Sequence, residues 1–473
     1  MAFLRGALAI ALSLLLASTD ASSPRQVASF NVTPEIGEKY GCGARCQAIV
    51  NMANAADLDT IGAMFDQDWY ATPINFTSSS KPGDLLKIES MKAADLGVRY
   101  GTSVFRFQYT TRDLDGSSVP TSGIIAFPFS VPASGRFRPV VYGHSSIGVS
   151  YGCAPSNSPS LFEARVWGAL IDRGYAIIAP DYAGLGNNYT IHKFSNLVTH
   201  ANDIYYAMVA ARNAFPNTFT NEWMSVGVFQ GAAGIWKLAE LPIVQKASSG
   251  YLGGVAIDPP SRQYDYGLYS IDHIFSKPDC MKYGATAEIP FSALTVKRTY
   301  PEYDYAMLGP TLKKRMGLIE ELQLCTNAIL SLVLDLEMPE ILSFDGTRND
   351  KIAQKFQKEY GVSNGDTAAT PLWVASGEND TFLQPYAVTE PARLSCSYGN
   401  SIDLRMYPGL DHEPTTAAST PEWTQWIADQ FNRVHRRHGC TNITQTPFNL
   451  DTASTIDVWG EYLALADSVP SDL

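Results

Sequence analysis

The sequence predicts an α/β protein with a mostly parallel central sheet and a helical cap inserted over it. From about residue 100 to 240, and again after 370, short apolar segments alternate with segments of helical spacing. This alternation is typical of a parallel sheet covered by helices. Between 260 and 350 the sequence becomes helix-rich, with many aromatic and charged residues. The chain has 473 residues, 45% of them hydrophobic, which is enough for a large core.

The first residues, 1–21, are predicted to be an export signal. Arg5 supplies positive charge, Ala7–Ala17 is almost wholly apolar, and Thr19–Ala21 offers small residues near a cleavage site. The apolar run is too short to cross a bilayer core of roughly 30 Å, although an uncleaved anchor is the alternative. No other stretch has the roughly 18 apolar residues of a membrane helix. We therefore expect a secreted protein without a stable membrane span.

After this signal the chain divides into a core and three additions. Residues 22–80 are mixed and polar, and we expect a leader that wraps the core. The core comprises 81–259 and 351–445, and the cap comprises 260–350. The tail, 446–473, indicates no clear function. No internal repeat is present.

The core segments differ in the pattern that predicts them. Alternating side chains indicate a half-buried strand, whereas short apolar runs indicate fully buried strands. The predicted strands are Val104–Tyr109, Gly123–Phe129, Pro139–Tyr142, Tyr175–Pro180, Met224–Val228, Pro371–Gly377 and Ile402–Tyr407. The predicted helices are Val198–Phe215, Ile235–Leu241 and the closing helix Trp423–Arg436.

Net charge limits the kinds of binding partner, and the cysteine content bears on disulfide bonding. The net charge of −12 and the pI of about 5.1 make the surface repel phosphate backbones, so we expect no nucleic-acid partner. Seven cysteines in an oxidising compartment should mostly pair, and the odd count leaves one over. Cys42 and Cys46 are close enough to close a local loop. A zinc site there would need nearby histidines, which are missing, so no metal or cofactor is predicted.

Sequons add to the prediction of export. We expect glycosylation at Asn31, Asn75, Asn188 and Asn442. A fifth sequon, at Asn379, lies in a segment assigned below to the active site, and we do not expect it to be modified.

Two segments near the end of the core predict a catalytic acid and histidine. Tyr407–His412 places His412 in a loop after a strand, and Gly377–Asp380 places Asp380 after another. The stretch between them leaves room for one helix and one strand. In this order the carboxylate would fix the tautomer of the imidazole and stabilise its protonated form. A surface aspartate and a surface histidine are the structural alternative.

A third segment has the form of a nucleophile elbow without a nucleophile. Gly227–Gly231 lies between a predicted strand and helix, with glycines at both ends as Gly-x-Ser-x-Gly requires. The central residue is Phe229, which has no hydroxyl or thiol to attack a carbonyl. Ser225 cannot replace it, because Ser225 lies inside the strand.

Together these segments resemble the fungal secretory lipases of the lipase-A type, which are α/β-hydrolases, over about residues 80–440. The matching pieces are Pro139–Gly148 with Cys153–Ser156, Pro180–Gly186, the elbow, Gly377–Asp380 and Tyr407–His412. The resemblance implies that Asp380 is the acid, that His412 is the base and that the nucleophile serine has been replaced by Phe229.

The resemblance also implies an oxyanion hole and disulfides. The hole would use the backbone N–H of Gln230 and the loop that starts at Gly143. This loop departs from the family pattern, because Ser145 stands where glycine is expected; His144 beside it is a candidate pocket residue. The implied disulfides pair Cys396 with Cys440 and Cys153 with Cys325, which leaves Cys280 unpaired if Cys42 bonds Cys46.

Three functions fit these observations. The first is a non-hydrolytic acid–base enzyme of secondary metabolism, which uses Asp380 and His412 for isomerisation, elimination or cyclisation of a small hydrophobic metabolite. The second is an inactive lipase relative that binds apolar ligands. The third is an ester hydrolase that uses water activated by His412, although losing a triad nucleophile typically costs about 10⁶ in turnover. The ligand is expected to be a small hydrophobic or ester-like molecule, and the retained Asp380 and His412 favour the first function.

Overall fold

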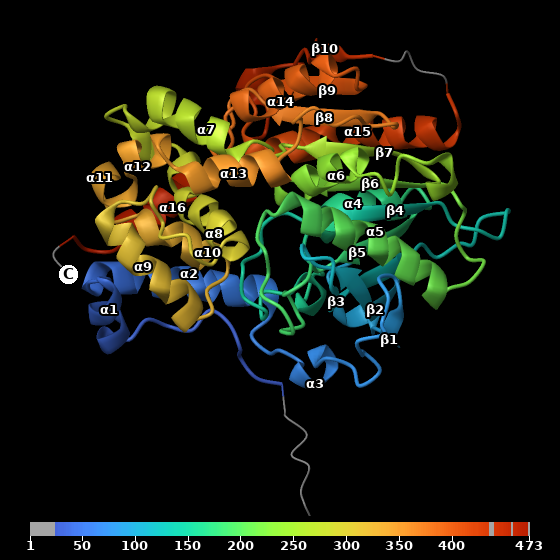
Figure 1. The fold of residues 1–473 in the computed structure, drawn as a ribbon, viewed down its shortest axis with the longest axis horizontal. Helices are drawn as coiled ribbons and strands as arrows, with labels where there is room; N and C mark the ends of the chain where they lie inside the picture. Colours follow the sequence, from blue (N-terminus) through green and yellow to red (C-terminus); the bar gives the residue numbers. More distant parts are fainter. Residues whose placement is uncertain (1–23, 435–438, 456, 472–473) are drawn as a thin grey trace, which may run out of the picture.

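A single mixed sheet forms the centre of the molecule. The computed structural model describes residues 24–434, 439–455 and 457–471. Its strands are β1 (Leu85–Ser90), β2 (Ser103–Arg112), β3 (Ser118–Phe127), β4 (Pro139–Gly143), β5 (Ala176–Pro180), β6 (Trp223–Val228), β7 (Tyr251–Ile257), β8 (Leu372–Gly377), β9 (Ile402–Tyr407) and β10 (Thr441–Thr444). Their order in the sheet is β1-β2-β3-β5-β4-β6-β7-β8-β9-β10 (Figure 1).

The sheet is antiparallel at one end and parallel over the rest. β1, β2, β3 and β5 pair antiparallel, whereas all pairs from β5 to β10 are parallel. Every residue of β4, β5, β6, β7 and β8 is buried. Burial on both faces explains why these strands are continuous apolar runs in the sequence. The predicted mostly parallel α/β architecture is confirmed.

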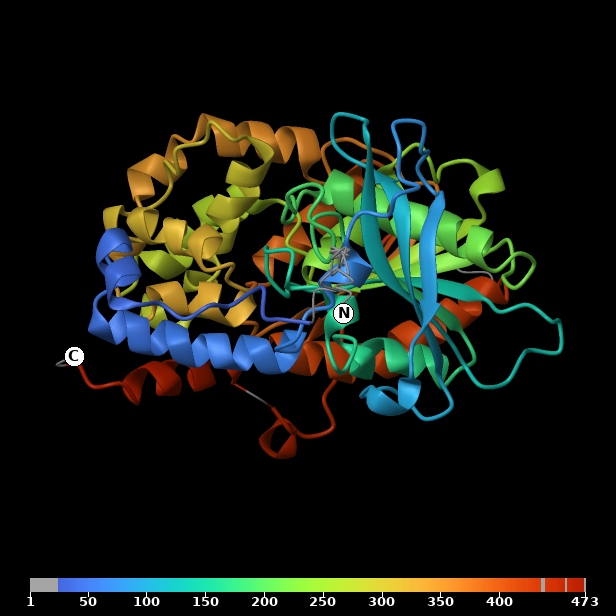
Figure 2. The ribbon, with the colours of Figure 1, turned by 90° about the horizontal axis from the view of Figure 1, so that it is seen from below.

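Helices cover both faces of the sheet. Those that follow core strands are α4 (Ala164–Ile171), α5 (Leu197–Ala214), α6 (Gln230–Glu240), α14 (Tyr386–Ser397) and α15 (His412–Phe431). α5 packs beside α6 on one face, and α4 packs beside α15 on the other, with the strands between the two pairs (Figure 2). The short helix α3 (Gln67–Tyr70) precedes β1.

A second hydrophobic cluster lies beside the core, where the cap was predicted. Its helices are α8 (Ile289–Thr299), α9 (Pro310–Glu321), α10 (Thr326–Leu330), α11 (Met338–Ile341) and α12 (Phe344–Arg348). Two further helices contact them: α7 (Gln263–Ser270) contacts α12, and α13 (Lys351–Tyr360) contacts α8. Single 3₁₀ turns occur at Ala93–Asp95, Pro155–Asn157, Ala247–Ser249, Cys280–Lys282, Gly284–Thr286, Ser331–Val333 and Leu450–Thr452, and a π turn at Ile271–Phe275.

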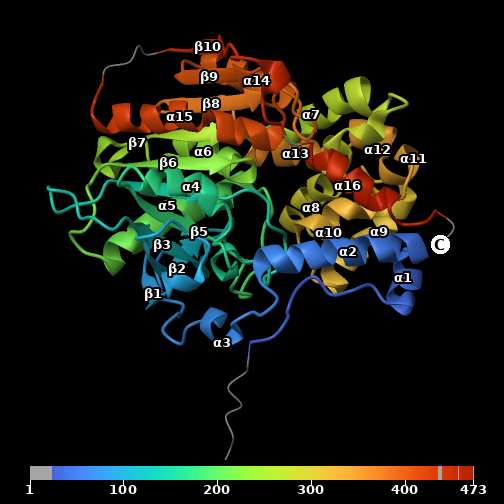
Figure 3. The ribbon, with the colours of Figure 1, turned by 180° about the vertical axis from the view of Figure 1, so that it is seen from behind.

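Both ends of the described chain join this cluster. From residues 22–80, α1 (Pro34–Tyr40) and α2 (Ala44–Ile61) pack on the cap helices α9 and α10. From the tail, α16 (Val458–Asp467) runs beside α2 along the cap (Figure 3). Its Ala466 carbonyl accepts a hydrogen bond from Arg45. The cap therefore contains segments from three distant parts of the sequence.

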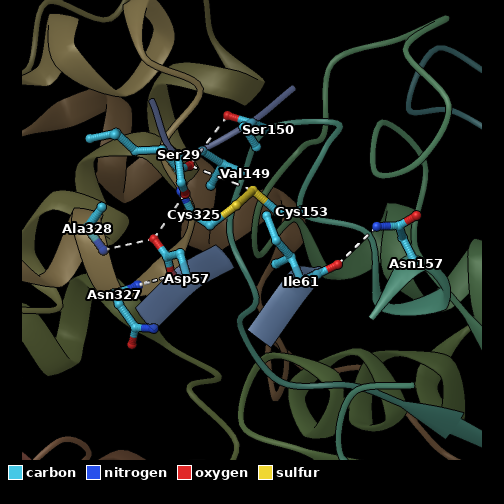
Figure 4. The surroundings of a disulfide bond; sticks show 12 residues. Ser29, Asp57, Ile61, Val149, Ser150, Cys153, Asn157, Cys325, Asn327 and Ala328 are labelled. Atoms are coloured by element: carbon cyan, nitrogen blue, oxygen red, sulfur yellow. Dashed lines mark hydrogen bonds between the residues drawn. A yellow bond between two sulfur atoms is a disulfide. The ribbon is translucent and has the colours of Figure 1, made fainter. Parts of the chain in front are cut away.

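A disulfide connects the cap to the core, and beside it a buried carboxylate joins α2 to the cap helix α10 (Figure 4). Cys153, in a core loop, bonds Cys325 at the start of α10. Asp57 of α2 accepts the backbone N–H groups of Asn327 and Ala328, at 2.8 and 3.1 Å, and so satisfies donors at the α10 N-terminus. The expected disulfides Cys42–Cys46 and Cys396–Cys440 are also present, and Cys280 is free and buried.

Several predicted boundaries differ from the structure. The closing helix was predicted as Trp423–Arg436, but α15 starts at His412 and ends at Phe431. The earlier start is possible because packing tolerates Pro421 inside the helix. β7 lies in a segment where no strand was predicted. The predicted signal at 1–21 lies outside the described residues. Within the described residues no helix is long and apolar enough to cross a membrane.

The four sequons expected to be glycosylated lie at exposed positions. Asn31, Asn75, Asn188 and Asn442 are all exposed, so a glycan would meet no steric obstacle from the core. Their modification remains a prediction.

Candidate active site

The predicted site residues meet at the carboxyl ends of neighbouring parallel strands. Phe229 follows β6, Asp380 follows β8, and His412 follows β9 as the first residue of α15. A fourth residue, Asp258, directly follows β7, which lies between β6 and β8. Strand order thus brings together residues that are far apart in the sequence.

Phe229 occupies a strained turn between β6 and α6. Its φ of 47° and ψ of −113° are unusual for a residue with a side chain and cost on the order of 1–3 kcal/mol. The glycines on either side are required by close packing: a Cβ at Gly227 would lie 2.5 Å from the Gly231 carbonyl carbon, and one at Gly231 would lie 2.1 Å from the Gly143 oxygen. The Phe229 ring stands perpendicular to the imidazole of His412, with centroids 5.1 Å apart.

His412 and Asp380 form a direct pair. Nδ1 of His412 lies 2.7 Å from Oδ2 of Asp380. The other Asp380 oxygen accepts the backbone N–H groups of Phe382 and Leu383, at 2.8 and 2.7 Å. Asp380 is fully buried, whereas the His412 side chain is 17% exposed. The carboxylate is therefore fixed, and Nε2 of His412 remains available to a ligand.

Asp258 adds a second acid to this pair. Its Oδ2 lies 3.9 Å from Nδ1 of His412, and its side chain is completely buried. Neither oxygen has a hydrogen bond of normal length within the described structure. Burial, assisted by the charge of Asp380, raises the pKa of Asp258 well above its usual value, and the charge of His412 opposes this shift only in part. Burial therefore favours the protonated form of the Asp258 carboxyl.

The environment of His412 favours its protonated form. Burial alone would lower the pKa of the imidazole, but the charge and hydrogen bond of Asp380, with the charges of Asp258 and Asp411, outweigh burial and raise it to about 10. His412 is thus an imidazolium at neutral pH, with Asp380 as its counter-ion.

The distance between His412 and Asp380 fits a hydrogen bond rather than two ligands of one metal ion. Asp258, Asp380 and His412 each place one possible metal-ligand atom within 4.8 Å of the others. Two ligands bonded at roughly 2.0–2.2 Å to one tetrahedral zinc ion would lie more than about 3 Å apart. The 2.7 Å separation of His412 and Asp380 is shorter and fits a hydrogen bond.

The predicted oxyanion loop is engaged by a carboxylate. The backbone N–H of Ser145 donates to Glu163 at 3.1 Å, and the Ser145 hydroxyl also donates to Glu163. Tyr142 donates to the same carboxylate at 2.6 Å. The Glu163 carboxyl group, whose pKa is raised by burial, therefore occupies the donors of Ser145, at the loop where the resemblance implies stabilisation of an oxyanion.

Two other residues named from the sequence face the protein interior. His144 is buried and stacks on Tyr182 with centroids 4.2 Å apart; burial lowers its pKa to about 4. The side-chain amide of Gln230 lies 3.2 Å from Nε2 of His200. Neither residue lines the two cavities at His412, whereas Ser145 lines the outer one.

Two adjoining cavities meet at Phe229, and His412 lines the outer one. The outer cavity, of about 330 Å³, is lined by His412 together with residues of the core, of the cap, of α2 and of α16. An inner chamber of about 70 Å³ is mostly apolar. Phe229, Phe382 and Glu288 line both. The site thus offers a charged acid–base group beside an apolar space.

Asp258 and Glu288 were not identified from the sequence. Asp258 follows the apolar segment Gly254–Ile257, so recognition of β7 would have placed it at the carboxyl edge of the sheet. Glu288 precedes α8 in the cap, and no pattern in its neighbourhood indicates a role.

Comparison with known proteins relates the fold to solved hydrolases. No known protein-family profile matches the sequence, and no curated protein sequence matches it. The structure is similar to that of lipase A from Candida antarctica in its closed state, with a TM-score of 0.62 and 15% identity over 85% of this chain and 94% of that one. It is also similar to the rice cell wall degrading esterase LipA from Xanthomonas oryzae, with a TM-score of 0.58 and 16% identity over 75% of this chain and 100% of that one. The chain therefore has the α/β-hydrolase fold of these lipases and esterases.

Proposed function

We propose that this α/β-hydrolase-fold protein is a non-hydrolytic acid–base enzyme that acts on a small hydrophobic metabolite. One observation carries the proposal: His412 and Asp380 form a direct 2.7 Å pair beside a cavity, while the turn at β6 that faces them bears Phe229. An oriented imidazole can move protons without a nucleophile. Isomerisation, elimination and cyclisation are reactions of this kind.

Three features argue against ordinary ester hydrolysis. Asp380 bonds Nδ1 of the His412 imidazole, and among the described residues no hydroxyl or thiol is hydrogen-bonded to Nε2, where a triad nucleophile would lie. Ser225 is buried and hydrogen-bonded to Tyr251 at 2.7 Å. The backbone N–H of Ser145 is already hydrogen-bonded to Glu163 and so is not free to stabilise an oxyanion.

The raised pKa of His412 indicates that catalysis begins with proton donation. The imidazolium would give the proton on Nε2 to an alkene or oxygen of the substrate, and Asp380 would hold the ring by Nδ1. Loss of a proton or of water from the resulting cation, or attack on it by another part of the molecule, would give the product. His412 would then regain its proton from the product or from water, so that no other reagent is consumed.

The test combines proton-transfer and hydrolysis assays. The protein would be incubated with hydrophobic β,γ-unsaturated ketones and tertiary allylic alcohols, and conversion to conjugated ketones or dienes would be followed by mass spectrometry and NMR. We expect conversion by the wild type and none by His412→Ala. Nitrophenyl esters should be hydrolysed no faster by the wild type than by His412→Ala, and fluorophosphonates should leave the mass unchanged.

Two results would count against the proposal. His412-dependent ester hydrolysis, with a fluorophosphonate adduct on Ser145, Ser146 or Ser225, would identify a hydrolase with another nucleophile. Absence of any His412-dependent conversion, with tight binding of the same compounds, would favour the alternative of an inactive relative that binds apolar ligands.

We further propose that the protein is a secreted member of the secretory-lipase type that acts in secondary metabolism. The sequence of residues 1–21, three disulfides and four exposed sequons support secretion. The segments Pro180–Gly186 and Tyr407–His412 support the kinship. Intact-mass analysis of protein secreted by a eukaryotic host, before and after glycosidase treatment, would test cleavage and glycosylation together.

A further inference from the structure

Glu288 is an acidic group at the site that has no partner in the structure. It precedes α8 and lines both cavities, as do Phe229 and Phe382. No described side chain makes an ion pair or hydrogen bond with it, and the nearby charges that act on it are those of His412 and Asp380. The Glu288 side chain is only partly buried, so this unpaired carboxylate faces the cavities and is open to a ligand that brings an opposite charge.

The outer cavity has an excess of acidic side chains. Its lining includes the carboxyl groups of Asp57, Glu163, Glu288, Asp411 and Glu413, whereas no lysine or arginine is among its described residues. Most of these groups are already engaged: Asp57 binds the α10 N-terminus, Glu163 binds Ser145, and Asp411 accepts from Thr381 at 2.8 Å. Glu413 is exposed at the mouth. Inside the cavity, Glu288 is the carboxylate left for a ligand.

The sign of this charge distinguishes between classes of ligand. A cavity rich in carboxylates disfavours a fatty acid and favours a cation. The aromatic rings of Phe229, Phe382 and Tyr266, all on the inner chamber with Glu288, can also attract a cation through their faces. Burial raises the pKa of Glu288 to about 7, the charge of His412 lowers it and that of Asp380 raises it. A bound cation would favour the ionised carboxylate.

We propose that Glu288 anchors the ammonium group of a lipophilic amine, whose apolar body lies in the two cavities at His412. This inference deepens the proposed function, on which it rests, by naming the substrate class: the amine nitrogen binds Glu288, and a different part of the same molecule receives the proton of His412.

The experiment measures charge preference by calorimetry. Phenylalkylamines would be compared with phenylalkyl alcohols of the same chain length, because the two differ mainly in charge. We expect the wild type to bind the amines roughly tenfold to hundredfold more tightly, as a charged hydrogen bond permits. Glu288→Gln, which keeps the shape of the side chain, should lose this preference while it still binds the alcohols.

Two variants separate the contact from other effects. Glu413→Gln removes the same charge from the exposed mouth and should keep most of the preference. His412→Ala removes a positive charge that lowers the pKa of Glu288, so this variant is compared above pH 8, where Glu288 is ionised, and should keep the preference there. Circular dichroism and thermal unfolding would establish that each variant is folded.

The outcomes distinguish this inference from the proposed function. A preference for amines that persists in Glu288→Gln, or one that is absent from the wild type, overturns the anchor. A preference that depends on Glu288, in a protein without any His412-dependent conversion, supports the anchor and removes only the proposed catalysis.

Discussion

Phe229 holds a backbone conformation that suits a nucleophile, yet its side chain cannot act as one. The turn has φ 47° and ψ −113° and points the ring at His412. Because Gly227 and Gly231 allow helix α6 and strands β4 and β6 to approach closely, the turn should persist when the side chain changes. The residue at 229 can therefore be exchanged without altering the fold around it.

We predict that Phe229→Ser gains weak ester hydrolysis that depends on His412. A serine hydroxyl at this turn would lie near the imidazole, but Glu163 occupies the N–H of Ser145, and one lost oxyanion donor costs about 10²–10³ in rate. His412 must also lose its proton to act as a base, so the rate should rise with pH up to about 10. The measurement is nitrophenyl-ester hydrolysis between pH 6 and 10.

Two comparisons make this result specific. Phe229→Ala opens the same space without a hydroxyl, and the double variant Phe229→Ser with His412→Ala lacks the base. Equal rates in all three proteins would mean that His412 is not poised to activate a residue at this turn.

We also predict that His412 stays doubly protonated at pH 8. Burial lowers the pKa of His412, and Asp380 is the main group that raises it. In Asp380→Asn the effect of burial should prevail and bring the pKa of His412 below its ordinary 6.5. Long-range ¹H–¹⁵N NMR spectra of the ring nitrogens report this directly, and His144, with a pKa of about 4, provides a neutral reference. A His412 ring that is neutral at pH 8 in the wild type would contradict the proposed acid role.

The same shift links protonation to stability. The pKa of His412 is higher in the folded state than its ordinary value, so protonation of His412 stabilises the folded protein against unfolding. This contribution is fully present below about pH 6.5 and is lost as the pH rises through about 10. Asp380→Asn should largely abolish this part of the pH dependence of unfolding.

At the level of elements, the Cys153–Cys325 disulfide joins a core loop to α10, and Asp57 adds α2 to the same junction. The Cys153–Cys325 disulfide joins residues separated by 172 positions in the sequence, whereas Cys396–Cys440 joins residues separated by 44. A chain-entropy estimate gives about 5 and about 4 kcal/mol, so stability alone would separate the two bonds poorly. Their locations differ more: the first lies between cap and core, and the second joins α14 to the start of β10.

We predict that removal of these two disulfides loosens different elements. Cys153→Ser with Cys325→Ser should increase hydrogen exchange in α2 and α10, because Asp57 joins these helices next to the disulfide and the Asn157 side chain joins α2 to the core. Cys396→Ser with Cys440→Ser is the matched control and should affect α14 and β10 instead. Identical exchange patterns in both double variants would refute this assignment of the junction. Mass spectrometry of deuterated peptides resolves these elements.

On the scale of the whole molecule, the C-terminal tail completes the outer cavity. Trp459 of α16 is fully buried, its indole donates to the Met281 carbonyl at 2.8 Å, and its ring meets that of Phe382 with centroids 6.0 Å apart. Tyr462 lines the cavity and is hydrogen-bonded to Asn327. The tail thus links the cap to the loop that follows Asp380.

We predict that Trp459→Ala destabilises the protein by about 3–5 kcal/mol and opens the cavity to solvent. A hydrophobic dye should then bind with greater fluorescence below the unfolding temperature. Phe448→Ala is the matched control, because Phe448 lies in the same tail but is fully exposed, so its loss should change neither quantity. Unchanged dye binding in Trp459→Ala would show that α16 does not close the cavity.

The sequence by itself predicts the mostly parallel sheet and most of its strands, because burial on both faces requires the apolar runs that are visible in it. β9 was predicted with its observed bounds, Ile402–Tyr407. β7 was missed because Gly253 and Gly254 interrupt its apolar pattern. Glycine is needed there because a Cβ at Gly254 would lie 2.4 Å from the Ile235 side chain. The close packing that excludes a side chain also removes the signal for the strand.

The sequence also predicts the Asp380–His412 pair, because the loops after two neighbouring strands hold each residue and the strand order brings those loops together. Only the tertiary structure adds Asp258 and Glu288, which come from a strand without a clear pattern and from the cap. It also decides that His412 is charged. Spacing along the chain does not determine a pKa, which depends on burial and on distances to other charges, and folding alone sets both.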